Sequence, residues 1–125
     1  MDAKSLHAHL AHFTGSSTFT RHALVRSVLM TEGVAFLADA AAAHWLTDAI
    51  ASYQHLPLVA AQPFQNWCLR VDTEVRSAVL TMTDGNSMDA IIRQEIDHTD
   101  FPLDEIALWL VADGEHQVLM LSGEY

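Results

Sequence analysis

Cysteine, basic residues and long apolar runs are all scarce in this sequence. It has one cysteine, Cys68, and only six lysines and arginines among its 125 residues. A single thiol cannot form an internal disulfide. No apolar run approaches the roughly 18 residues that a membrane helix requires, and residues 1–7 lack the basic segment and apolar block of a signal peptide. We therefore expect a cytoplasmic protein with no membrane span, and nothing indicates a cofactor.

Acidic residues dominate the charge, and they are unevenly placed. Sixteen Asp and Glu against six Lys and Arg give a net charge of −10. Residues 1–65 hold four acids and three bases (net −1), and residues 66–125 hold twelve acids and three bases (net −9). Such a negative field repels a nucleic-acid backbone, so direct binding to DNA or RNA is not expected. A protein partner with a basic surface fits better, and the alternative is that the acids only keep the chain soluble.

The hydrophobic pattern predicts one α+β domain over residues 1–125. Half of the residues are hydrophobic, which suffices for one core in a chain of this length. In the first half, apolar spacing predicts a short helix over 3–13 and a strand over 21–30. A tight turn at 31–33 and a returning strand over 34–37 follow. The last element of this half is a long amphipathic helix over about 39–54, with Asp39 as its N-cap.

The second half reads as a succession of strands. Pro57 and Pro63 bracket a connection that no helix should cross. Alternating apolar residues then predict strands over 64–71, 78–82, 88–97, 106–112 and 117–121, with a hairpin turn at Asp84-Gly85-Asn86. The expected architecture is a mostly antiparallel sheet of about five or six strands, with one long helix packed on it and a short N-terminal helix.

The histidines invite a test for a metal or catalytic site. His9 and His12 would share one face of the first helix, and His44 and Asp48 are one turn apart on the long helix. Paired cysteines and a His-Glu-x-x-His motif are absent, so these four residues are weak metal candidates. With His22 they define the alternative function, a small histidine-using metal-binding protein or hydrolase. No catalytic constellation is present, and we expect a protein that is not an enzyme.

An acidic cluster offers the better candidate for a site. Five acids fall within eleven residues with no Lys or Arg beyond Arg93 beside them: Glu95, Asp97, Asp100, Asp104 and Glu105. The spacing of a calcium loop is missing. Three interpretations remain: a cation site of another kind, a surface that docks on a basic protein, and a solvated rim.

Several short strings resemble an uncharacterised family of small bacterial proteins found on plasmids, prophages and integrative elements. The strings span nearly the whole chain: Phe13-Thr14-Gly15, Arg21-His22, Thr31-Glu32-Gly33-Val34, Leu37-Ala38-Asp39, Trp45-Leu46, Asp48, Ile50-Ala51, Phe101-Pro102-Leu103, Glu105-Ile106 and Ser122-Gly123-Glu124-Tyr125. The sequence departs from the pattern at Met30, where the family often has an aromatic residue. The resemblance implies a compact domain from a mobile element, and it carries no activity, cofactor or site residue.

The function predicted from these observations is a non-enzymatic, acidic protein-interaction module. In a mobile element it would suit an inhibitor of a host defence complex, an anti-CRISPR-like protein whose carboxylates mimic nucleic-acid phosphates. The partner-binding residues would then be the five acids of the cluster. A homodimer is a further expectation, formed through a sheet edge or an apolar helix stripe, with Trp45, Trp67 and Trp109 as sources of apolar contact area.

Overall fold

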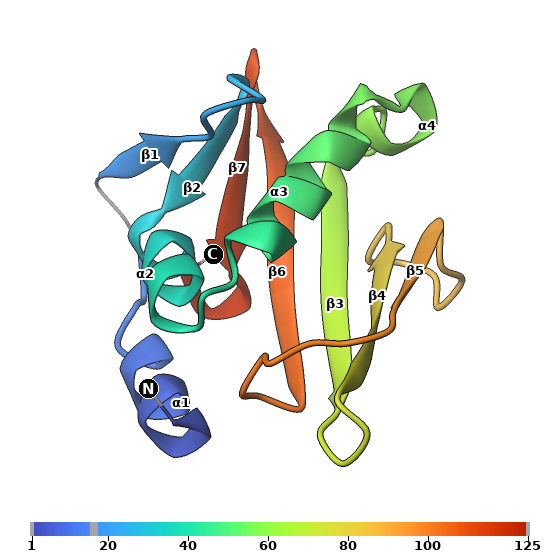
Figure 1. The fold of residues 1–125 in the computed structure, drawn as a ribbon. Coiled ribbons are helices and arrows are strands. Elements are labelled where there is room, and N and C mark those ends of the chain that lie inside the picture. Colours follow the sequence, from blue (N-terminus) through green and yellow to red (C-terminus); the bar gives the residue numbers. More distant parts are fainter. Residues whose placement is uncertain (1, 16–17, 125) are drawn as a thin grey trace.

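The computed structural model describes residues 2–15 and 18–124, which form one mixed sheet and several short helices (Figure 1). The strands are β1 (Phe19–Arg21), β2 (Val28–Thr31), β3 (Phe64–Asp72), β4 (Ser77–Thr83), β5 (Ile92–Ile96), β6 (Glu105–Asp113) and β7 (His116–Leu121). The helices are α1 (Ala3–Leu10), α2 (Glu32–Ala40), α3 (His44–Ser52) and α4 (Pro57–Ala60), with 3₁₀ turns η1 (Tyr53–His55) and η2 (Ser122–Glu124).

The seven strands lie in the order β1-β2-β7-β6-β3-β4-β5. Every neighbouring pair is antiparallel except β2 and β7, which run parallel. The last strand, β7, therefore sits inside the sheet between the N-terminal ribbon and the C-terminal meander (Figure 1).

The helices α2 and α3 cross one face of the sheet, and the core lies between them and the strands (Figure 1). Strand β4 shows the division: Ala78, Leu80 and Met82 are buried, and the alternate residues Val79 and Thr81 are only half-buried. Successive side chains of a strand point to opposite faces. The large buried side chains include Leu37, Leu46 and Ile50 from the helices and Trp67, Leu69, Leu80, Leu108, Leu110 and Leu119 from the strands.

A network of buried amides joins the end of α3 to the sheet. Gln65 is fully buried; its Nε2 donates to Gln54 Oε1 at 2.9 Å and to the Val59 carbonyl at 3.0 Å. Gln65 Oε1 accepts from Gln54 Nε2 at 2.8 Å and from Trp67 Nε1 at 2.9 Å. Gln117 Nε2 also donates to Gln54 Oε1, at 2.9 Å. Because each buried polar group finds a partner, this part of the core tolerates its amides.

The predicted strand over 34–37 is wrong, because these residues belong to α2. Thr31 ends β2 and caps the helix, with its Oγ1 accepting from the Val34 amide at 3.3 Å. Asp39 is therefore in the last turn of α2 and is no N-cap. A four-residue apolar run does not distinguish a strand from a buried helical turn, and the sequence at residues 31–33 fits a tight turn as well as a helix start.

The predicted long helix over 39–54 is two helices. After α2 the chain reverses through Ala42, whose φ of 50° is left-handed. The Ala43 amide donates to the Ala38 carbonyl at 2.9 Å, and the Ala42 amide to Asp39 at 3.4 Å. This is the Schellman pattern, which normally places glycine at the left-handed position. Because alanine stands there instead, the sequence carries no stop signal.

The strands of the second half lie close to where they were predicted. The chain bends at Asp84-Gly85, with Gly85 at a φ of 85° and Asp84 Oδ1 accepting from the Asn86 and Ser87 amides. These two backbone bonds lower the pKa of Asp84. The predicted tight hairpin is instead a longer connection over residues 84–91. Strand β5 is shorter than predicted, since the connection from β4 extends through Ile91. The connection between the two prolines holds the short helix α4, which begins at Pro57, because the first turn of a helix tolerates proline, and ends at Ala60, before Pro63.

The fold is thus α+β, as predicted, with seven strands and several short helices in place of five or six strands and one long helix. Among the described helices none has the length and hydropathy to cross a membrane.

Candidate functional site

The five predicted acids lie along β5, the start of β6 and the connection between these strands. Glu95 is on β5, Glu105 opens β6, and the other three acids lie in residues 97–104. Phe101 and Leu103 hold this connection to the core, since both are buried. The fold therefore keeps the cluster together along one border of the sheet.

Three arginines neutralise part of this cluster, and two of them, Arg70 and Arg76, are distant from it in sequence. Arg93 Nη2 lies 3.8 Å from Glu95 Oε1, Arg76 Nη2 3.5 Å from Asp100 Oδ1, and Arg70 Nε 3.7 Å from Glu105 Oε1. Five acids and three paired arginines leave a local charge of −2. The pairs are exposed and contribute little stability. Most of these ion pairs cannot be predicted from the sequence, because Arg70 lies on β3 and Arg76 lies in the turn after it.

The histidine candidates do not converge on a metal site. His9 is occupied by its own helix and by α2: its Nδ1 lies 2.7 Å from the Ser5 carbonyl, and its ring stacks on Phe36. The neighbouring candidate, His12, brings no third ligand to it. Across residues 2–15 and 18–124, no group of three His, Cys, Asp or Glu side chains could hold a metal ion.

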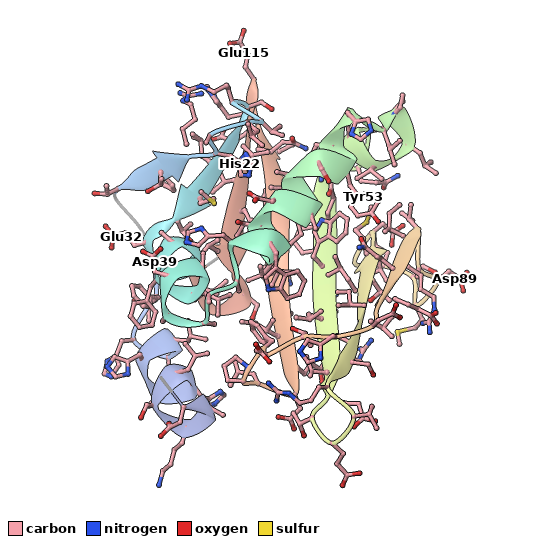
Figure 2. All side chains as sticks on the ribbon, viewed as in Figure 1. His22, Glu32, Asp39, Tyr53, Asp89 and Glu115 are labelled. Carbon is pink, nitrogen blue, oxygen red and sulfur yellow. The ribbon has the colours of Figure 1, made fainter. Side chains whose placement is uncertain are left out.

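His44 and Asp48 do not pair with each other. His44 Nε2 lies 2.8 Å from Asp39 Oδ1, across the break between α2 and α3, and both side chains are largely exposed. The predicted one-turn pair is wrong because the helix begins at His44, so that its ring turns back toward α2. Figure 2 shows Asp39 at the end of α2.

Asp48 instead pairs with the buried ring of His22, 26 residues earlier. His22 Nε2 lies 2.8 Å from Asp48 Oδ1, and His22 Nδ1 accepts from the Leu24 and Val25 amides at 3.2 and 3.0 Å. An imidazole nitrogen that accepts two amide protons carries none itself, so Nε2 bears the proton and donates it to Asp48. Both ring nitrogens are engaged, and the pair holds the 22–28 turn against α3. It offers no lone pair for general-base chemistry.

A second buried contact joins two strings of the resemblance, Thr31-Glu32-Gly33-Val34 and Ser122-Gly123-Glu124-Tyr125. Tyr125 lies outside the described residues. Glu124 is 8% exposed, and its carboxylate lies at the N-terminus of α2. It accepts from Thr31 Oγ1 at 2.6 Å, the Leu121 amide at 3.0 Å and the Gly33 amide at 3.3 Å. A carboxylate is favourable at this end of a helix. The motif serves the fold, since the chain's own acid fills this anion site.

The face of the sheet away from α2 and α3 carries several partly exposed apolar side chains; we call it the open face. Its side chains alternate with those of the core and stay only partly buried. The apolar members in the middle of the face are Phe64, Val79, Trp109, Val111, Val118 and Met120. Phe64 and Trp109 pack edge to face with ring centroids 5.2 Å apart.

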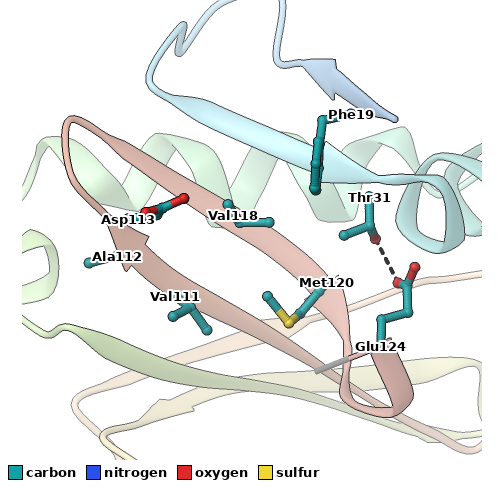
Figure 3. A pocket seen from close by; sticks show the side chains of 8 residues that line it. All are labelled: Phe19, Thr31, Val111, Ala112, Asp113, Val118, Met120 and Glu124. Atoms are coloured by element: carbon teal, nitrogen blue, oxygen red, sulfur yellow. Dashed lines mark hydrogen bonds between the residues drawn. The ribbon is translucent and has the colours of Figure 1, made fainter. Parts of the chain in front are cut away.

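Two shallow hollows mark the open face, each with an aspartate beside apolar side chains. One has a volume of about 360 Å³ and is lined by Phe19, Val118, Met120 and Asp113, with Thr31 and Glu124 at its end (Figure 3). The other, of about 370 Å³, lies between Phe64, Trp109 and the turn at Asp84. Apolar alternation in the sequence predicts these strands, but it does not indicate which of their two faces the helices cover.

Cys68 lies on the open face but is not activated. Its Sγ donates to Glu105 Oε1 at 3.4 Å. Burial, and then this carboxylate, raise the pKa of the thiol above its ordinary value. The thiol therefore stays protonated near neutral pH and does not act as a nucleophile.

The fold and its contacts define a one-sided α+β sheet domain whose polar side chains serve structure, with a partly apolar open face. A family model described as "Family of unknown function (DUF6876)" matches residues 4–125, and the chain belongs to that family. No curated protein matches the sequence.

A solved structure shares the fold. The chain is similar to a protein of unknown function from Enterococcus faecalis, with 16% sequence identity and a TM-score of 0.58. The match covers 86% of this chain and 98% of that chain. At this identity the similarity supports the architecture alone.

Proposed function

We propose that this protein is a non-enzymatic interaction module that docks a partner protein on the open face of its sheet. The observation that carries the proposal is that this face presents aromatic and aliphatic side chains, Phe64 and Trp109 among them, which the helices leave partly exposed. Exposed apolar patches with a polar border are typical of protein-binding surfaces, and Trp is among the residue types enriched at the few positions that carry most of the binding energy.

The charge of the open face sets the chemistry of the partner. Glu95 and Glu105 are paired with arginines, whereas Asp84 and Asp113 border the two hollows and have no ion pair in the described residues. The pKa of Asp84 is lowered, so its charge persists into acidic solution. The partner is therefore a protein that presents apolar side chains flanked by lysine or arginine.

Paired substitutions on the two faces test this function. Met120→Arg places a charge in the middle of the open face, and Leu58→Arg places the same charge on α4, where Leu58 is 65% exposed. We expect wild type and Leu58→Arg to retain the same partner from a lysate of the source cell, and Met120→Arg to lose it. Val118→Thr should weaken the binding of that partner, purified and titrated by calorimetry, without adding charge. Equal binding by all variants would refute docking on the open face.

Charge reversal of Asp97, Asp100, Asp104 and Glu105 separates this mode from nucleic-acid mimicry. An inhibitor of a defence complex, of the anti-CRISPR kind, would depend on these acids and bind a basic nucleic-acid channel. Docking on the open face keeps most of its affinity after reversal to lysine, because the apolar contacts remain. If reversal abolishes binding while Met120→Arg does not, the phosphate-mimic function replaces the one proposed here.

A further inference from the structure

Strand β5 ends the sheet and has a neighbour on one side only. It pairs with β4 over Ile92–Ile96, and no strand follows it in the sheet order. None of the backbone hydrogen bonds of the described residues joins the connection at 84–90 to β5, and residues 85–90 are exposed at every position. The outer hydrogen-bonding groups of β5 are thus free to pair with another strand.

The side chains of β5 are arranged symmetrically about Gln94. Ile92 and Ile96 are half-buried on the face that carries the helices, whereas Arg93 and Glu95 point to the open face and are 61% and 76% exposed. Reading outward from Gln94, a basic residue stands on one side and an acidic residue on the other, and each is followed by isoleucine.

This pattern matches itself when two copies of β5 pair antiparallel with Gln94 opposite Gln94. Arg93 of each copy then lies opposite Glu95 of the other, and Ile92 opposite Ile96. Residues directly opposite in such a pair share one face of the sheet. Two Arg–Glu pairs would form on the open face and two Ile–Ile contacts on the helix face, which extends the core from one copy to the next.

The neighbouring registers are unfavourable. A shift by one residue would place core-facing side chains opposite those of the open face. Centring the pair on Arg93 puts Arg opposite Arg and Asp89 opposite Asp97. Centring it on Glu95 puts Glu opposite Glu. In the register centred on Gln94, Asp89 and Asp97 lie opposite Thr99 and Ile91, so no acid faces another acid between residues 88 and 100.

We propose that two copies of this protein form a symmetric dimer by pairing their β5 strands in the register centred on Gln94, with Arg93 of each copy opposite Glu95 of the other. The two sheets become one continuous sheet, and the helices of both copies lie on the same side. Both open faces remain accessible, and they lie next to each other. The dimer does not depend on the function proposed above.

Charge exchange tests this dimer and its register. In Arg93→Glu both pairs become Glu–Glu, and in Glu95→Arg both become Arg–Arg. We expect each single variant to dimerise at least about tenfold more weakly than the wild type in sedimentation equilibrium. The double variant Arg93→Glu/Glu95→Arg restores both pairs and should dimerise as the wild type does. An equal mixture of the two single variants should form a heterodimer, since every pair is then Arg–Glu.

Two controls carry the same changes in net charge away from β5: Lys4→Glu on α1 and Glu74→Arg in the turn after β3. Both should dimerise as the wild type does. The proposal is overturned if the wild type stays monomeric at every concentration, if the single variants dimerise like the wild type, or if neither the double variant nor the mixture recovers the dimer. Met120→Arg keeps the β5 edge intact, so its dimerisation distinguishes failure of the open face from failure of this interface.

Discussion

Removal of the Glu124 carboxylate tests the contact between the C-terminal turn and the start of α2. The carboxylate accepts hydrogen bonds from Thr31 Oγ1 and from the amides of Gly33 and Leu121. Glu124 is 8% exposed, so water cannot fully replace these bonds. A hydrogen bond to a charged group contributes about 1.5–3 kcal/mol, and bonds that share one acceptor are not additive. We expect Glu124→Ala to lower the free energy of unfolding by about 2–4 kcal/mol.

Urea unfolding followed by circular dichroism measures this loss. For a chain of this size it corresponds to a fall in melting temperature of roughly 10 °C. The free energy of unfolding of Glu124→Gln should lie between those of the wild type and Glu124→Ala. Its amide oxygen still accepts hydrogen bonds, but its NH₂ group is a donor that faces other donors. Glu115→Ala is the control: Glu115 is exposed in the β6–β7 turn and projects away from the body (Figure 2).

Gly33→Ala perturbs the same contact, and the sign of its effect on the free energy of unfolding tests the reasoning. Helix propensity alone would make alanine the more stable residue by about 1 kcal/mol. An added Cβ would, however, lie 2.5 Å from Glu124 Oε1 and 2.6 Å from Leu121 Cδ1. We expect net destabilisation that becomes smaller in the Glu124→Ala background, where only the contact with Leu121 remains. The reasoning fails if Glu124→Ala loses less than about 0.5 kcal/mol, which is the range of neutral surface substitutions, or if Gly33→Ala is stabilising.

Three further predictions concern the other buried polar groups. Gln65→Leu should cost about 2–3 kcal/mol in urea unfolding, because the Trp67 indole and the Gln54 amide lose a buried partner; a neutral result would contradict the network. In ¹⁵N correlation spectra, His22 should show its proton on Nε2 throughout the folded state at neutral pH, and a proton on Nδ1 would contradict the two amide donors. Native Cys68 should react with a thiol reagent more slowly than the unfolded chain, with a pH midpoint above the ordinary value because its pKa is raised; Glu105→Gln should lower that midpoint part of the way, since burial remains the larger cause.

The sequence predicted those elements whose signals are local. Strand alternation identified β3, β4, β6 and β7, and Asp84-Gly85 located the turn after β4. The errors lie where tertiary packing decides between local alternatives. The run at 34–37 fits a strand as well as a helix until Glu124, some 90 residues later, occupies the helix start. The break at Ala42 uses a residue that normally continues a helix.

The candidate site was harder to predict, because its features depend on contacts across the sheet. The acids at 95–105 read as a strongly negative cluster until cross-strand and turn arginines such as Arg70 and Arg76 were placed beside them. Asp48 was assigned to His44 by its helical spacing, and it binds His22 instead. The open face could not be predicted from the sequence, because alternation defines two faces of a strand but does not indicate which one the helices cover.

The position of β7 has a consequence for how the chain is made. Residues 116–121 are made about 90 residues after β2, yet they occupy the middle of the sheet, parallel to β2 and next to β6. Until they emerge, β2 and β6 have no common neighbour and expose apolar edges to other nascent chains. Folding during synthesis therefore cannot go to completion strand by strand, because the sheet closes only when β7 joins segments about 90 residues apart. Such long-range closure is slow, so the pairing of β7 with β2 and β6 is a slow step in the formation of the sheet.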